Sequence, residues 1–280
     1  MAEKTHNGQR PARRPSRAGP AYVRQEGPNP TRAGSCFYQG VPHARHAPVK
    51  ARINDDQSPL ADLHRKGRLG GEGWRMASWN VGSLTGKSGE VAEELGKRKV
   101  DVCGVQETRW KGEGARFLGA VGCRYKLWWK GGVDGTGGVG VMVREELADQ
   151  VLEVWRRSER VIVVTMLIGK VLTRVISGYA PQQVRGECEK DKFYDELSDE
   201  IGKAGDSEFV VVLGDLNGHV GEQVDGCEGV HGGFGYGQSN LEGCRVLELC
   251  DAYGLMVGNT LFKREKEKLI TYRSGAERGR

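Results

Sequence analysis

Polar side chains follow apolar stretches at four points along this 280-residue sequence, and their types are those that catalytic sites use. The clearest case is FVVVLGDLNGHVG at residues 209–221, where an apolar run ends in a carboxylate and, two residues later, an amide. Side chains two apart on an extended strand point to the same side, so these two groups can act on one ligand. The candidate site residues are Asn80, Glu107, Tyr179, Asp215 and Asn217.

The five side chains divide into metal ligands, a base and hydrogen-bond donors. Asn80 and Glu107 offer oxygen ligands for a hard cation such as Mg²⁺, which takes few protein ligands and keeps waters or phosphate oxygens. Asp215 can orient or deprotonate an attacking water. Tyr179 and Asn217 can donate hydrogen bonds to phosphoryl oxygens. Together these groups predict phosphodiester hydrolysis with Mg²⁺ as the cofactor.

Each residue taken alone also has a purely structural interpretation. Asp and Asn after a strand are frequent turn formers, and a Glu at a strand end is usually solvated. Tyr179 precedes Ala180-Pro181 and can be a packed ring with a satisfied hydroxyl. His219 and His231 can be ordinary loop residues. It is the ordered set of strand-end residues that favours a site.

Interspersed strands and helices must position these residues. Apolar alternation and helical spacing predict strand 74–80, helix 87–99 with Ser88 as N-cap, strand 100–107, strand 137–143, antiparallel strands 161–168 and 171–181, helix 192–204, strand 209–217, helix 240–254 and strand 256–262. Because several neighbouring strands form hairpin-like pairs, the pattern favours a mixed sheet packed against helices. The expected fold class is α/β.

The segment YKLWWKGG at residues 125–132 has two interpretations. Its aromatic and lysine side chains could stack on bases and contact phosphates. Alternation along a strand would instead bury Trp128 or Trp129 in the core, because adjacent large aromatics on a strand divide between its two faces. We favour the core interpretation.

The positive charge is concentrated at the N-terminus. Residues 1–70 carry 13 Lys and Arg against five Asp and Glu, whereas the remaining residues are slightly acidic. Proline, glycine and arginine without an apolar period predict a disordered basic tail over 1–70 and a folded domain over 71–280. The tail is either a solvated or translated flanking segment, which we favour, or an arm that holds nucleic acid through phosphates.

Neither a membrane span nor a secretory signal is expected. The longest apolar run, 161–168, is interrupted by Thr165 and is far shorter than a membrane helix. The seven cysteines are scattered without a CxxC pair, which argues against a zinc site or a disulfide framework. We expect an intracellular protein, and nuclear residence would follow from a DNA substrate.

The strand-end motifs resemble a known family. WNVGSL, VQET, SGYAP and GDLN occur in the order and at the separations of the endonuclease/exonuclease/phosphatase superfamily, the fold of DNase I and the abasic-site endonucleases. The longer phrases MASWNVGSLTGK, DVCGVQETRWKG, LGDLNGHVG and GVHGGFGYG resemble the endonucleases of non-LTR retrotransposons and the craniofacial development protein 2-like sequences derived from them. The resemblance covers roughly residues 74–275.

This resemblance implies a DNase I-like two-sheet sandwich flanked by helices and Mg²⁺-dependent nicking of DNA. By resemblance, Asn80 and Glu107 lie on the metal side and Tyr179 contacts the scissile phosphate. It also implies that Asp215 acts on the nucleophilic water and that Asn217 positions the phosphate and Asp215. Asn259 and Thr271-Tyr272 match a later segment that comes close to substrate.

One departure from the family pattern concerns the C-terminus. After TYRSG the family continues into further strands and an Asp-His pair, but here the sequence ends at Arg280. We therefore expect a C-terminally incomplete domain and impaired hydrolysis, with neither His219 nor His231 replacing the family histidine. Two alternatives stay open: a non-enzymatic remnant that at most binds DNA or a protein, and a phosphatase of the same superfamily. The oligomeric state is not predicted.

Overall fold

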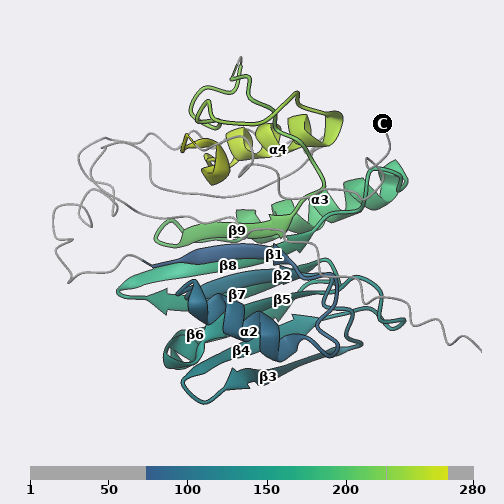
Figure 1. Cartoon of the computed structure of the whole chain (residues 1–280). Helices are drawn as coiled ribbons and strands as arrows, with labels where there is room; N and C mark the ends of the chain where they lie inside the picture. Colours follow the sequence, from purple (N-terminus) through teal and green to yellow (C-terminus); the bar gives the residue numbers. More distant parts are fainter. Residues whose placement is uncertain (1–73, 225, 264–280) are drawn as a thin grey trace, which may run out of the picture.

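Two β-sheets packed face to face form the centre of the protein (Figure 1). The computed structural model describes residues 74–224 and 226–263. The first sheet has the strand order β1-β2-β5-β4-β3 and contains β1 (Met76–Asn80), β2 (Val102–Gln106), β3 (Glu113–Ala120), β4 (Cys123–Lys130) and β5 (Val139–Arg144). The second has the order β6-β7-β8-β9 and contains β6 (Val151–Arg156), β7 (Val161–Ile168), β8 (Val171–Tyr179) and β9 (Phe209–Asp215).

Helices cover the outer faces of both sheets (Figure 1). One lies against the first sheet and two lie against the second: α2 (Ser88–Lys97), α3 (Glu187–Gly202) and α4 (Leu241–Ala252). Two short 3₁₀ helices complete the described elements, η1 (Glu145–Gln150) and η2 (Gly258–Thr260). The expectation of an α/β fold with a DNase I-like two-sheet sandwich is confirmed.

Apolar side chains fill the space between the sheets and bury the inner faces of the central strands. Residues of β1, β2, β4 and β5 meet residues of β7, β8 and β9 in one cluster. Trp128 belongs to this cluster, whereas Trp129 packs on the opposite face, against the cluster under α2. The core interpretation of the YKLWWKGG segment is therefore confirmed.

Each sheet contains one parallel pair of strands, and these pairs position the candidate site. β1 runs parallel to β2, and β8 runs parallel to β9. The other pairings are antiparallel. Strands that run in parallel end on the same side of a sheet, so each pair brings two strand-end side chains together.

The two parallel pairs approach closely at Gly104 in the middle of β2. A Cβ at this position would lie 2.6 Å from the Leu213 Cβ and 3.0 Å from the Leu213 carbonyl oxygen of β9. Only a residue without a side chain permits this approach. Gly104 thus sets the distance between the sheets close to their site-bearing ends.

Several local predictions need correction. The expected strand 256–262 is absent, and η2 lies within that range. Ser88 is the first residue of α2 rather than its N-cap, because a turn from Leu84 to Lys87 leads into the helix and Lys87 occupies the cap position. The predicted tail over 1–70 and Thr271-Tyr272 lie outside the described residues. Within the described residues, none of the helices has the length and apolarity that crossing a bilayer requires.

Substituting Gly104 tests the close approach of the sheets. Gly104→Ala should lower the free energy of unfolding by about 1–3 kcal/mol, because the added methyl group meets strand backbone that cannot give way locally. Urea denaturation measures the change. Gly89→Ala in α2 is the matched control, since a Cβ there meets nothing within 4 Å. The control should leave stability unchanged or raise it. Equal stability of the two variants would contradict the role given to Gly104.

Candidate active site

The side-chain amide of Asn80 joins the two sheets at the carboxyl ends of their parallel strands. Its Nδ2 donates to Glu107 Oε1 at 3.0 Å and to Asp215 Oδ2 at 2.8 Å. Asn80 ends β1, Glu107 follows β2, and Asp215 ends β9. Three predicted residues from distant parts of the chain therefore meet in one hydrogen-bonded cluster.

Tyr179 makes a second contact between the sheets. Its hydroxyl, at the end of β8, donates to Glu107 Oε1 at 2.9 Å. Burial raises the pKa of Tyr179, and the negative charges of Glu107 and Asp215 raise it further. The phenol therefore stays protonated at neutral pH and can donate a hydrogen bond.

The carboxylate of Glu107 is held by donors on both oxygens. Oε1 accepts from Asn80 and Tyr179, and Oε2 accepts from Arg109 Nη2 at 2.8 Å. Partial burial raises the pKa of Glu107, but the three hydrogen bonds and the charge of Arg109 outweigh burial and leave the pKa below its ordinary value. Glu107 is therefore ionised at neutral pH.

The backbone around Glu107 adopts left-handed conformations that non-glycine residues rarely take. Glu107 has φ +55° and Arg109 has φ +53°. The Thr108 and Arg109 N–H groups donate to the carbonyls of Gly138 and Gly137, which holds the segment against the start of β5. Such conformations persist only where neighbouring structure enforces them, and they concentrate at functional sites.

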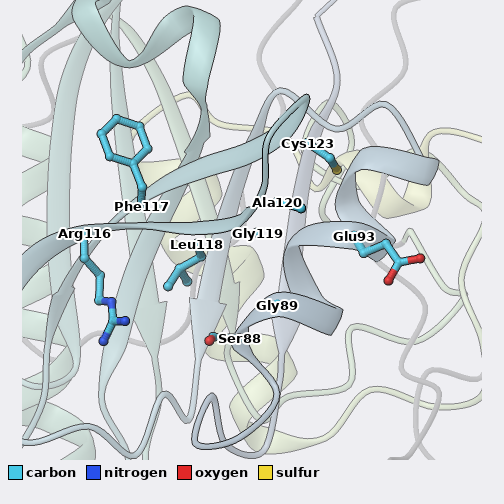
Figure 2. A pocket seen from close by; sticks show the side chains of 9 residues that line it. All are labelled: Ser88, Gly89, Glu93, Arg116, Phe117, Leu118, Gly119, Ala120 and Cys123. Carbon is cyan, nitrogen blue, oxygen red and sulfur yellow. The ribbon is translucent and has the colours of Figure 1, made fainter.

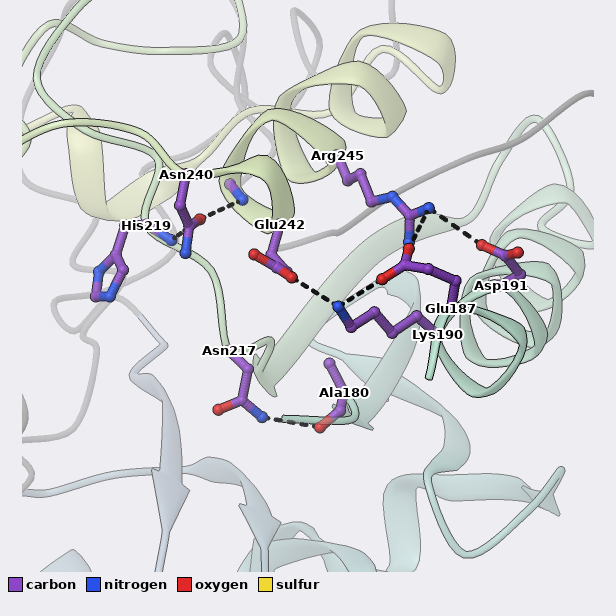
Figure 3. A network of polar contacts seen from close by, with 10 residues as sticks. Ala180, Glu187, Lys190, Asp191, Asn217, His219, Asn240, Glu242 and Arg245 are labelled. Carbon is purple, nitrogen blue, oxygen red and sulfur yellow. Dashed lines mark hydrogen bonds and ion pairs between the residues drawn. The ribbon is translucent and has the colours of Figure 1, made fainter. Parts of the chain in front are cut away.

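Asn217 supports Asp215 through its backbone, whereas its side chain is bonded to Ala180 (Figure 3). Its N–H donates to Asp215 Oδ1 at 3.2 Å, whereas its Nδ2 donates to the Ala180 carbonyl at 2.8 Å. β9 ends at Asp215, and Asn217 has φ +53°. The expected strand alternation therefore does not extend to Asn217.

A buried polar layer crosses the sheets directly below the cluster. Ser78 Oγ of β1 donates to Gln106 Oε1 of β2, and Gln106 Nε2 donates to Ser177 Oγ of β8, each at 3.3 Å. All three side chains are buried. The sequence analysis missed this layer, although a glutamine inside an apolar strand is a signal that a buried hydrogen-bond partner exists.

Asn240 fixes the loop that follows Asp215, and the sequence analysis missed this role as well (Figure 3). Asn240 Oδ1 accepts from Gly243 N–H at 2.8 Å, which caps α4, and from His219 N–H at 2.9 Å. The Asn240 N–H in turn donates to the His219 carbonyl at 3.0 Å. A Cβ on Gly243 would collide with that carbonyl, so the close contact requires glycine.

A network of charges holds α3 against α4 beside this loop (Figure 3). The buried Lys190 of α3 bridges Glu187 of α3 and Glu242 of α4, each at 2.8 Å. Arg245 of α4 pairs with Glu187 and Asp191 at 3.2 and 3.1 Å. The network positions the helix whose N-terminus carries Asn240.

Neither histidine in the described residues forms a hydrogen bond or an ion pair with the cluster. His231 is buried, its Nε2 contacts the Gly221 carbonyl at 3.1 Å, and its Nδ1 accepts from Gly233 N–H at 3.0 Å. Burial lowers the pKa of His231, so its ring is neutral at neutral pH. Both ring nitrogens contact the backbone of neighbouring loop residues. His219 is exposed and contacts Asn240 only through its backbone.

A hollow in the described structure lies elsewhere, between α2 and β3 (Figure 2). It has a volume of about 540 Å³ and is lined by Ser88, Gly89, Glu93, Arg116, Phe117, Leu118, Gly119, Ala120 and Cys123. None of the predicted site residues contributes to it. The candidate site at the sheet edge is therefore separate from this hollow.

The cluster suits a hard cation that needs few protein ligands. Within the described residues, no group of three or more His, Cys, Asp or Glu side chains could hold a metal ion. Mg²⁺ needs only one or two carboxylates, and Glu107 and Asp215 are linked through one amide. The Asn80 oxygen accepts from Gly82 N–H at 3.0 Å, so its nitrogen faces the carboxylates.

The sequence also matches a family model over a stretch that includes all five predicted residues. That model describes the endonuclease/exonuclease/phosphatase family and matches residues 77–224. The chain belongs to this family. Craniofacial development protein 2 from Bos taurus is 28% identical over 72% of this chain and 34% of its own length, so the chain spans about a third of that curated relative.

Solved structures similar to this chain include two nucleases. The endonuclease domain of TRAS1, a telomere-specific non-LTR retrotransposon, is 17% identical, with a TM-score of 0.40 over 65% of this chain and 71% of that one. AP endonuclease LMAP from Leishmania major is 12% identical, with a TM-score of 0.41 over 64% of this chain and 66% of that one. Membership of the family is shown by the family-model match over residues 77–224 and not by these structural similarities.

Removing the Asn240 side chain should loosen the loop that carries the site. Asn240→Ala should lower the free energy of unfolding by about 1 kcal/mol, because Gly243 N–H and His219 N–H lose their acceptor. Asn240→Asp retains an acceptor and is the matched control. Thermal and urea denaturation measure the difference, and equal stability of the two variants would show that the side chain does not fix the loop.

Proposed function

We propose that this chain is a Mg²⁺-dependent phosphodiester hydrolase of the endonuclease type that acts on DNA. The observation that carries the proposal is the convergence of Asn80, Glu107, Tyr179 and Asp215 from four strand ends in two sheets. Family membership supports the same chemistry, since the family name covers endonucleases, exonucleases and phosphatases. A nuclear location would follow from a DNA substrate.

Glu107 is the residue we assign to the cation, and Asn80 orients its carboxylate through the side-chain amide. Mg²⁺ at this position would supply positive charge that offsets the charge of the phosphate and of the leaving oxygen. The donors on Glu107 keep its carboxylate ionised, so no proton has to leave before a cation can bind. This assignment requires only the oxygen ligands that the cluster provides.

The other cluster residues act on the phosphate and on water. Tyr179 remains a hydrogen-bond donor because its pKa is raised, so its hydroxyl can turn from Glu107 to a phosphoryl oxygen. Asp215 can accept the proton of an attacking water. Asn217 holds the end of β9 through Asp215 and Ala180 and so keeps the carboxylate in place.

Descent from a non-LTR retrotransposon is the narrower part of the proposal. The phrases DVCGVQETRWKG and GVHGGFGYG extend beyond the strand-end motifs that the whole family shares. The sequence relatives at 28% and 26% identity are both named craniofacial development protein 2, the group that these phrases indicate. A phosphatase of the same family has no specific observation in its favour.

Hydrolysis by the 280-residue chain is expected to be slow. Neither His219 nor His231 contacts the cluster, so no histidine among the described residues stabilises the transition state there. Losing one such electrostatic contact commonly costs on the order of 10²–10³ in rate. The same observation favours a second candidate function, a protein that binds DNA without cutting it.

Nicking of supercoiled plasmid DNA in Mg²⁺ tests the proposal. Glu107→Gln and Asp215→Asn should each reduce the nicking rate by at least about 10²-fold, because each removes a charge from the reacting centre while keeping the side-chain shape. Glu113→Gln is the matched control, since Glu113 forms an exposed pair with Lys130 away from the cluster. Chelation by EDTA should abolish nicking in every variant.

Four results would contradict parts of this scheme. DNA binding without nicking would support the second candidate function. Equal nicking by the Glu107 and Glu113 variants would place the chemistry outside the cluster. A wild-type rate near that of a full-length family member would overturn the expected impairment. Hydrolysis of soluble phosphoesters without nicking would indicate a phosphatase instead.

A further inference from the structure

Arg109 forms an ion pair with the carboxylate to which we assign the cation. Its Nη2 lies 2.8 Å from Glu107 Oε2, and the Arg109 side chain is 55% exposed whereas that of Glu107 is 16% exposed. The Arg109 N–H is fixed at 2.8 Å from the Gly137 carbonyl. The backbone is therefore held in place, while the exposed guanidinium has room to move.

A cation and the guanidinium compete for the same oxygen of Glu107. Oε1 already accepts from Asn80 and Tyr179, so Oε2 is the oxygen with spare capacity, and Arg109 occupies it. A divalent cation held by this oxygen would lie close to the guanidinium, and like charges at about 4 Å repel appreciably even in water. Cation binding therefore favours departure of Arg109.

Once displaced, Arg109 has no second acidic partner among the described residues. Its one ion pair there is with Glu107. A guanidinium presents paired N–H groups that match the oxygens of a phosphate, which is why arginine recurs at phosphate sites. The incoming DNA backbone would offer such an acceptor at the point where the cation binds.

We infer that Arg109 exchanges partners, pairing with Glu107 in the free protein and with a DNA phosphate when a divalent cation occupies Glu107. The inference rests on the proposed function. Cation binding and DNA binding should then strengthen each other, because a cation on Glu107 frees Arg109 for DNA and DNA on Arg109 frees Glu107 for the cation. The exchange also predicts that loss of the Arg109 side chain strengthens cation binding and weakens DNA binding.

Mn²⁺ affinity without DNA is the first measurement, using the electron paramagnetic resonance signal of the free ion. Arg109→Ala should bind Mn²⁺ about fivefold more tightly than wild type, because a competing charge is gone. Arg109→Lys, which keeps the charge, should stay near wild type. Arg157→Ala removes an arginine paired with Asp199 elsewhere on the surface and should change nothing.

DNA affinity is the second measurement, on a short duplex in Ca²⁺ at several salt concentrations. Arg109→Ala should bind DNA more weakly, and the slope of log affinity against log salt should fall by about 0.9, the value for one lost phosphate contact. Arg157→Ala should keep the wild-type slope. Tighter Mn²⁺ binding combined with weaker DNA binding is a signature that simple loss of structure does not produce.

The controls separate this inference from the proposed function. Glu107→Gln should weaken Mn²⁺ binding, and an unchanged affinity would overturn both the metal assignment and the role of Arg109. If Glu107→Gln weakens Mn²⁺ binding but Arg109→Ala matches Arg157→Ala, only the inference fails. It also fails if Arg109→Ala weakens Mn²⁺ and DNA binding together, because that result indicates a structural role. Thermal denaturation confirms that the variants are folded.

Discussion

The amide of Asn80 lies between two carboxylates that belong to different sheets, and the arrangement of the site depends on this contact. Glu107 and Asp215 would repel each other without a donor between them, and one NH₂ group supplies a hydrogen to each. Because the acceptors are in separate sheets, the amide also fixes how the sheets meet at this edge. Tyr179 repeats the connection, and the buried contact from Gln106 to Ser177 repeats it one layer below.

The strand ends were predictable because apolar runs have clear limits in the sequence. Asn80, Glu107, Tyr179 and Asp215 follow such runs, and parallel pairing then brings them to one edge. The orientation of Asn217 was not predictable from strand alternation. The alternation holds only while the backbone is extended, and β9 ends at Asp215 before a left-handed residue turns the chain.

Contacts between distant segments account for what the sequence analysis missed. Asparagine before a helix is a recognisable cap, but nothing local indicates that Asn240 also binds the backbone of His219, 21 residues away. Arg109 lies only two residues from Glu107, and their side chains pair where both backbones are left-handed. Such conformations are imposed by surrounding structure, here the start of β5, and not by the residues' own preferences.

In the proposed scheme, the charges of the cluster would determine the order in which a cation and a phosphate bind. Glu107 and Asp215 place two carboxylates at this edge, and Arg109 pairs with Glu107, so in the proposed scheme the site would attract a cation before it attracts a phosphate. A divalent cation would reverse this balance, and by the exchange that we propose it would free Arg109 to pair with the phosphate. The backbone at Glu107 and Arg109 is held by hydrogen bonds to Gly138 and Gly137. It would keep the carboxylate in place while the counter-ion of that carboxylate changes.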